Sequence, residues 1–181
     1  SKPVLALEVF YTQQGPAAGQ KEEREDTITR FWHHVAAKKQ NGQWTAALPL
    51  FSADKPLWAY ANVFYPLEKP VTGAGYYYGI YTADRFNLSS VMQVASPQEL
   101  KSAGVRAVLK PSFRIEDFTG DWQKEWFSYK PEQWPRSTHK IRDPQWQAPA
   151  SAKLALEVRA AQPNRLAVGL DKYAAEVLLQ G

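Results

Sequence analysis

The sequence predicts an all-β protein made of two small antiparallel β-sandwiches, with one short helix near their junction. Three observations favour this class: short apolar or alternating runs, Gly, Pro and Asn residues that separate these runs, and a change of pattern near residue 95. The expected domains are residues 1–95 and 96–181. Each would have about 90 residues, so each core must be dense in large side chains. A composition that is 44% hydrophobic and 13% aromatic meets that requirement.

The first strands follow from apolar runs and one strong turn signal. Residues 4–11 are short, apolar and followed by Gln-Gln-Gly-Pro, which predicts a buried strand. Residues 28–38 alternate between two strand faces, although a helix is possible there too. The strand is favoured because the Asn-Gly pair at 41–42 predicts a hairpin that joins 31–38 with 43–51, since both residues tolerate positive φ angles.

The rest of the first half continues the strand pattern. Residues 57–67 predict a strand with two largely apolar faces, residues 73–75 predict a turn, and residues 76–82 predict a further strand. Five strands at this spacing suggest an immunoglobulin-like sandwich. Residues 96–99, Ser-Pro-Gln-Glu, then supply an N-cap, a proline at the first helical position and a capping-box glutamate, with Gly104 placed to end a short helix.

The second half ends in three alternating segments, at residues 154–158, 166–170 and 175–179, which predict an antiparallel meander. A jelly roll needs about eight strands to cover both faces and protect its edges. Residues 96–181 offer fewer. We therefore expect an incomplete sandwich, truncated at its C-terminal end, in a chain that is a fragment of a longer polypeptide.

Charge and composition exclude several classes of function. The net charge is +4, but Lys and Arg are interleaved with Asp and Glu, so no basic stripe is expected to bind nucleic acid. The absence of cysteine removes disulfides, thiolate nucleophiles and sulfur metal ligands. No apolar run approaches the roughly 20 residues that span a bilayer, so no membrane contact is expected. An export signal would lie upstream of this sequence.

The common catalytic motifs are missing from the sequence. Adjacent His33 and His34 would lie on opposite faces of a strand, and His139 lies far from both in the sequence, so no metal site is expected. No G-x-S-x-G nucleophile motif occurs. Residues 73–79 resemble a glycine-rich phosphate loop, but three consecutive tyrosines prevent close backbone approach. We predict no catalytic residue, no metal and no cofactor on this chain.

An aromatic stretch at residues 115–146 is the strongest candidate for a binding site, because four of the seven tryptophans lie there beside charged and prolyl residues. Such tryptophans can fill a small core or stack on the apolar side of a sugar ring. Trp126 and Trp134 are the preferred exposed platforms because polar and prolyl residues surround them. The candidate carbohydrate-binding residues are Asp121, Trp122, Glu125, Trp126, Tyr129, Trp134 and Trp146.

The same stretch leaves an enzymatic alternative open. Glycosidases use two carboxylates at a defined separation, and Asp117, Asp121 and Glu125 lie close together in the sequence. Sequence spacing does not place two of them across a glycosidic bond. Solvated loop acids are the simpler interpretation.

Several segments resemble known proteins, namely residues 30–32, 44–50 and 56–63, which are rich in aromatic and prolyl residues. They resemble the region that follows the catalytic domain in secreted bacterial α/β-hydrolase-like proteins of the dienelactone hydrolase, acetylxylan esterase and PhoPQ-activated-protein type. The second half, at residues 122–127, 138–140 and 143–146 and in the closing strands, is similar to the galactose-binding-like sandwich of some of those proteins. The resemblance implies that the hydrolase serine, acid and histidine lie upstream and that the last strands lie beyond Gly181.

Together these observations predict a non-catalytic accessory region of a secreted carbohydrate-active hydrolase, which binds a glycan or packs on the catalytic domain. The expected partners are a polysaccharide and the remainder of the parent polypeptide, and the expected location is secreted or periplasmic. Two alternatives stay open: a small self-contained enzyme that acts on polysaccharide through a carboxylate pair, and a purely structural module with every tryptophan buried.

Overall fold

The computed structural model describes residues 3–16, 21, 30–75, 79–109, 114–117, 119, 140–146, 150–170 and 172–181. The fold is all-β, as the sequence predicts, with antiparallel sheets and little helix. Two compact units, Ser1–Gln147 and Ala148–Gly181, make up the chain, and each is described by itself. The predicted boundary at residue 95 and the sandwich type of each half stay predictions.

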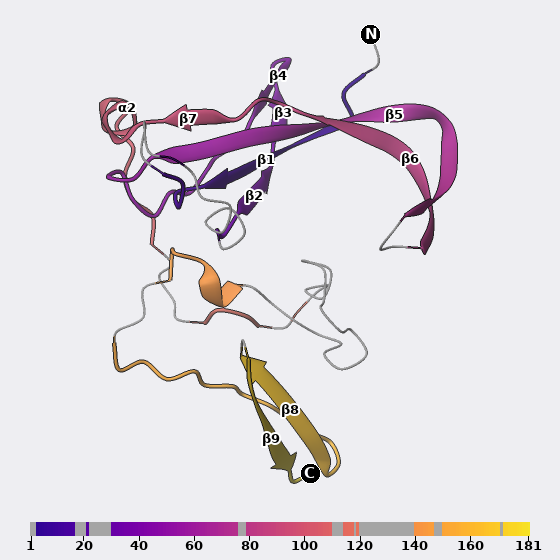
Figure 1. Cartoon of the computed structure of the whole chain (residues 1–181), viewed down its shortest axis with the longest axis vertical. Helices are drawn as coiled ribbons and strands as arrows, with labels where there is room; N and C mark the ends of the chain where they lie inside the picture. The colour runs from indigo at the N-terminus through magenta and orange to yellow at the C-terminus, as the bar shows by residue number, and fades with distance from the viewer. Residues whose placement is uncertain are drawn as a thin grey trace. The chain divides into compact units, whose positions relative to one another are not determined.

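The first unit is organised around one antiparallel sheet with the strand order β2-β1-β5-β6 (Figure 1). A fifth strand, β7, pairs with the first residues of β5, on the same edge as β6. The strands are β1 (Ala6–Thr12), β2 (His33–Ala36), β5 (Leu57–Gly75), β6 (Gly79–Ser89) and β7 (Gln93–Ala95). The predicted strands at 4–11 and 57–67 are therefore confirmed, and they lie side by side at the centre of the sheet.

Strand β5 continues well beyond the predicted end at residue 67. The predicted turn at 73–75 is wrong, because Gly73 and Ala74 pair with Tyr81 and Ile80 of β6. Glycine is weak in strands but not excluded from them, and the pairing is supported by a 2.7 Å hydrogen bond between the Thr72 and Thr82 hydroxyls. Figure 1 shows β5 and β6 running together beyond the N-terminal start of β1.

The predicted strand at 28–38 divides between two sheets. Its described part contains β2, which pairs with β1, while β3 (Lys38–Gln40) pairs with β4 (Gln43–Thr45). The Asn-Gly hairpin is confirmed, since Asn41 and Gly42 have φ angles of 49° and 79°. The hairpin is shorter than predicted: Lys38–Gln40 pair with Gln43–Thr45, while residues 33–36 pair with β1 instead.

The predicted helix is also confirmed. Helix α2 (Pro97–Ser102) begins after Ser96, whose hydroxyl accepts a hydrogen bond from the Glu99 amide, while the Ser96 amide donates to the Glu99 carboxylate at 2.7 Å. The Ser96 backbone bond, followed by its side-chain bond, lowers the pKa of Glu99. Gly104 follows the helix with a φ angle of 71°, a left-handed conformation that favours glycine.

The core of the first unit lies on one face of the sheet, near the start of β5. Its buried apolar side chains are Tyr11, Leu50 and Leu100. Partly buried residues packed against them are Val35, Leu48, Leu57, Ala59, Ala95 and Val105. Because Leu100 belongs to α2, this packing attaches the helix to the sheet.

In the described part of the second unit, β8 (Asn164–Leu170) and β9 (Tyr173–Leu179) form a hairpin. These strands confirm the last two segments of the predicted meander. The first segment, at 154–158, is not a strand in the structure, and its leucines are exposed. Exposure does not separate this segment from the other two, because Leu170 and Val177 are exposed as well. The difference is pairing: β8 and β9 are hydrogen-bonded to each other, whereas residues 154–158 pair with no strand among the described residues.

Candidate functional site

Most of the predicted carbohydrate-binding residues lie outside the described residues. These are Asp121, Trp122, Glu125, Trp126, Tyr129 and Trp134. Trp146 is described: it is half-buried, and its backbone amide donates a 3.0 Å hydrogen bond to the Asp143 carbonyl. The site that these residues were predicted to form stays a prediction.

Asp117, which the enzymatic alternative would use, is held as a carboxylate. The Thr119 hydroxyl and amide donate hydrogen bonds of 2.7 and 3.0 Å to the Asp117 Oδ1 atom. The hydroxyl bond, then the amide bond, lowers the pKa of Asp117, and Arg114 and Lys140 add to this effect. A general acid near neutral pH needs a raised pKa, so this environment does not favour Asp117 as a proton donor.

An aromatic face, defined here as Phe10, Trp32, His34 and Tyr60, lies on one side of the main sheet. Phe10 of β1 stands directly opposite His34 of β2 and Tyr60 of β5. The Phe10 ring stacks on Tyr60 at 5.2 Å and on His34 at 5.8 Å between centroids. Trp32 meets Tyr60 edge-on at 5.6 Å. The three apolar rings are half-buried and His34 is exposed.

A polar row runs beside the aromatic face, two residues along each strand. Glu8 of β1 stands opposite Asn62 of β5, and Asn62 stands opposite Ser89 of β6. The Ser89 hydroxyl donates a 2.6 Å hydrogen bond to the Asn62 side-chain carbonyl. That bond orients the amide of Asn62, whose NH2 group has two hydrogen-bond donors. Rings and polar groups therefore form two parallel rows that cross the strands.

The opposite side of the sheet carries a buried polar cluster, defined as Tyr11, His33, Asp143 and Gln145. The Tyr11 hydroxyl and the Gln145 amide donate hydrogen bonds of 3.0 and 2.8 Å to the same carbonyl, that of Pro49. Tyr11 stacks on His33 with ring centroids 4.9 Å apart. The His33 Nε2 atom lies 3.6 Å from the Asp143 carboxylate.

His33 and His34 thus face opposite sides of the sheet, as the sequence predicts. His33 joins the buried cluster and His34 joins the aromatic face. The two histidines therefore have unrelated environments, and each serves as a control for the other.

The pKa of Tyr11 predicts a loss of stability in alkali. Burial, with a further contribution from the Asp143 carboxylate, raises the pKa of Tyr11 to about 12. Between about pH 10 and 12 the unfolded phenol releases a proton that the folded one keeps, so the free energy of unfolding should fall across that window. Tyrosinate absorbance should show a last ionisation near pH 12. It should vanish in Tyr11→Phe and persist in Tyr173→Phe, and a last step unchanged in Tyr11→Phe would contradict the prediction.

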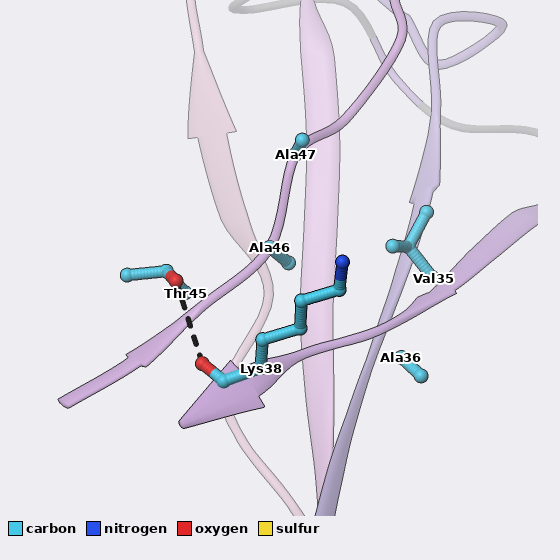
Figure 2. Close-up of a pocket in the computed structure, with 6 residues that line it drawn as sticks. All are labelled: Val35, Ala36, Lys38, Thr45, Ala46 and Ala47. Atoms are coloured by element: carbon cyan, nitrogen blue, oxygen red, sulfur yellow. Dashed lines mark hydrogen bonds between the residues drawn. The ribbon is translucent and has the colours of Figure 1, made fainter. Parts of the chain in front are cut away.

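A shallow pocket of about 410 Å³ lies between the end of β2 and the β3–β4 hairpin (Figure 2). Its lining residues are Val35, Ala36, Lys38, Thr45, Ala46 and Ala47. The Thr45 hydroxyl donates a long, 3.4 Å hydrogen bond to the Lys38 carbonyl. With one ammonium, one hydroxyl and otherwise small apolar side chains, this lining offers little chemistry.

Other kinds of site are not found in the part of the chain that the structure describes. Within it, no three His, Asp or Glu residues gather in a way that could hold a metal ion. None of its helices has the length and apolar character needed to cross a membrane.

Comparisons with known proteins add no relative. No family model, no curated protein and no solved structure matches the chain. The interpretation therefore depends on the residues themselves. Sequence reasoning missed the aromatic face because its members come from three separate segments. The available signal was the alternation that places Trp58, Tyr60, Asn62 and Phe64 on one side of the strand at 57–67.

Proposed function

We propose that this chain is a non-catalytic accessory module that binds a polysaccharide. The observation that carries the proposal is the aromatic face beside the polar row, on one side of the main sheet. Aromatic rings pack against the apolar C–H surface of a sugar, and neighbouring polar side chains bond its hydroxyls. The two rows together offer both kinds of contact.

The rings of the aromatic face are arranged so that one ligand can contact several of them. The planes of Phe10 and Tyr60 differ by 11°, with centroids 5.2 Å apart, which is the geometry of offset stacking. Offset leaves part of each ring uncovered, and this agrees with the half-buried state of both residues. A ligand can therefore contact consecutive rings without displacing either.

The direction of the two rows favours an extended ligand that lies across the strands. Residues two apart along a strand are separated by about 7 Å, so the row that contains Glu8 and Asn62 runs beside the row that contains Phe10 and Tyr60. A linear sugar chain above both rows would place its rings over the aromatic side chains and its hydroxyls over the carboxylate and amide. An open face accepts the middle of such a chain as readily as its end.

The wider biological setting is part of the proposal. The resemblance noted in the sequence supports association with a secreted carbohydrate-active hydrolase, whose catalytic residues would lie outside this chain. The expected partners are the polysaccharide and the remainder of the parent polypeptide, in a secreted or periplasmic location. The predicted tryptophans, with Trp126 and Trp134 preferred, would form a second sugar contact.

Removal of a ring from the aromatic face should weaken polysaccharide binding. Trp32→Ala and Tyr60→Ala should each lower affinity about tenfold, since buried aromatic anchors carry more than 1 kcal/mol of binding free energy. Affinity would be measured by calorimetry with soluble polysaccharides and by depletion with insoluble ones. Trp44→Ala is the matched control, because Trp44 is also half-buried but lies on β4, beside Lys39.

Each outcome of this experiment decides a question. A folded wild-type protein that binds no polysaccharide of a broad panel would refute glycan binding. An equal loss in Trp44→Ala and Trp32→Ala would refute the aromatic face as the site. Loss in Trp126→Ala alone would move the site to the aromatic stretch at residues 115–146. Circular dichroism of every variant would exclude unfolding as the cause.

A further inference from the structure

We propose that His33 and Asp143 form a pH-sensitive latch, which holds residues 140–146 against the main sheet when His33 is protonated. The inference does not depend on the proposed function. It uses the buried polar cluster, which lies on the side of the sheet opposite the aromatic face.

The latch joins segments that are far apart in the sequence. His33 begins β2, and Asp143 follows the short helix η2 (Lys140–Arg142). The His33 Nε2 atom and the Asp143 Oδ1 atom are 3.6 Å apart, and the two side chains are only 12% and 6% exposed. Little solvent screens a pair at this depth, so a charge on the imidazole changes its attraction to the carboxylate more than it would at the surface.

The rings around His33 hold it in place for this contact. Tyr11 stacks on one side of the imidazole, and the Phe31 ring meets it at 65° with centroids 4.8 Å apart. Aromatic rings also favour a cation over a neutral ring. The hydroxyl of Tyr11 donates to the Pro49 carbonyl and keeps its proton up to about pH 12. Tyr11 therefore does not change charge in the range in which imidazoles titrate.

The contacts that Gln145 makes with Pro49 and Asp143, and that Lys140 makes with Glu116, are not expected to respond to the same pH range. The Gln145 side chain donates to the Pro49 carbonyl at 2.8 Å, and the Gln145 backbone amide donates to Asp143 Oδ1 at 2.9 Å. Lys140 pairs with Glu116 at 2.8 Å. Amides do not titrate, and lysine and carboxyl groups ordinarily titrate outside pH 5.5–8.5. The imidazole of His33 is therefore the group in this set that gains or loses charge there.

The sign of the effect follows from the charge of the imidazolium. At low pH the positive His33 attracts the negative Asp143, and the segment is held. As the pH rises, His33 loses its proton, the ion pair is lost, and the Gln145 and Lys140 contacts remain. The segment should therefore open more often at pH 8.5 than at pH 5.5. Trp146, one of the predicted sugar contacts, would be released with it.

Hydrogen exchange with mass spectrometry tests the latch in the full chain. Exchange of peptides covering residues 140–146, corrected for the intrinsic pH dependence of amide exchange, should be about fivefold faster at pH 8.5 than at pH 5.5 in the wild type. His33→Gln and Asp143→Asn should remove this difference. His34→Gln, which replaces the neighbouring histidine on the opposite face, should retain it.

The exchange experiment can still test the latch if one of the variants is unstable. Asp143→Asn keeps the oxygen that accepts the Gln145 amide, so it removes the charge and preserves the turn. The wild-type protein alone is also informative: equal corrected exchange at the two pH values would overturn the proposal. A pH difference that persists in either His33→Gln or Asp143→Asn would overturn it too. Loss of the difference in His34→Gln alone would assign the effect to His34 and would also overturn the proposal.

Discussion

Gln13→Ala is expected to lower the free energy of unfolding by about 3 kcal/mol, because it breaks a partly buried set of three hydrogen bonds. Gln13 is only 2% exposed. Its side-chain amide donates to the carbonyls of Ser52 and Lys55 at 2.6 and 3.3 Å, and its carbonyl accepts from the Ser52 amide at 3.1 Å. Alanine would leave the Ser52 amide and the Ser52 and Lys55 carbonyls without this partner. Each of these groups that stays shielded from water costs about 1–3 kcal/mol.

Urea denaturation followed by tryptophan fluorescence would measure the loss. Gln43→Ala is the matched control, since Gln43 is exposed on β4 and its truncation should change stability by less than about 0.5 kcal/mol. Gln13→Glu should also destabilise, because a carboxylate would then face two carbonyl oxygens. Equal stability of Gln13→Ala and Gln43→Ala would show that this side chain does not hold residues 52–55.

Leu100→Ala is expected to lower the free energy of unfolding by a similar amount, about 3 kcal/mol, through a cavity in a small core. Leu100 is 5% exposed and belongs to the same buried cluster as Tyr11 and Leu50. Alanine is a slightly better helix former than leucine, so the loss cannot come from helix propensity. It would measure how strongly α2 is packed on the sheet.

The control for this prediction lies on the same helix. Gln98→Ala replaces an exposed side chain two residues earlier and should leave stability within about 0.5 kcal/mol of the wild type. Thermal and urea unfolding of both variants would be compared. A loss below about 1 kcal/mol in Leu100→Ala would mean that the core closes around the missing side chain or that α2 contributes little to the fold.

Local signals in the sequence were sufficient for the helix and the hairpin. Ser96 and Gly104 mark the start and the end of the helix, and both signals depend only on residues within a few positions in the sequence. The same is true of Asn41 and Gly42, whose positive φ angles are needed for the turn. Such features depend on residues within a few positions, so sequence reasoning found them.

Pairing between distant segments was harder to predict from the sequence. Gly73 belongs to a glycine-rich segment that predicts a turn, but its pairing with Tyr81 of β6 makes it part of strand β5. The alternation at 154–158 predicts a strand, yet alternation carries no information on which segment would pair with it. In both cases the outcome depends on a partner segment that the local sequence does not specify.

The candidate sites illustrate the same limit. The aromatic stretch at 115–146 was visible because its tryptophans are neighbours in sequence. Phe10, Trp32 and Tyr60 become neighbours only through the β2-β1-β5 pairing. His33 was correctly placed on the opposite face from His34, but its partner Asp143 comes from a segment with no strand pattern.

The nineteen residues of β5 have a consequence for how the first unit comes apart. One of its edges is bonded to β1, and the other is bonded to β7 and then β6. No one of these three strands keeps its pairing with β5 if β5 itself leaves the sheet. Separation of β5 is therefore a single cooperative event for four strands. The amides of residues 58–64, which lie between β1 on one edge and β7 and β6 on the other, should be among the last in the unit to exchange with solvent.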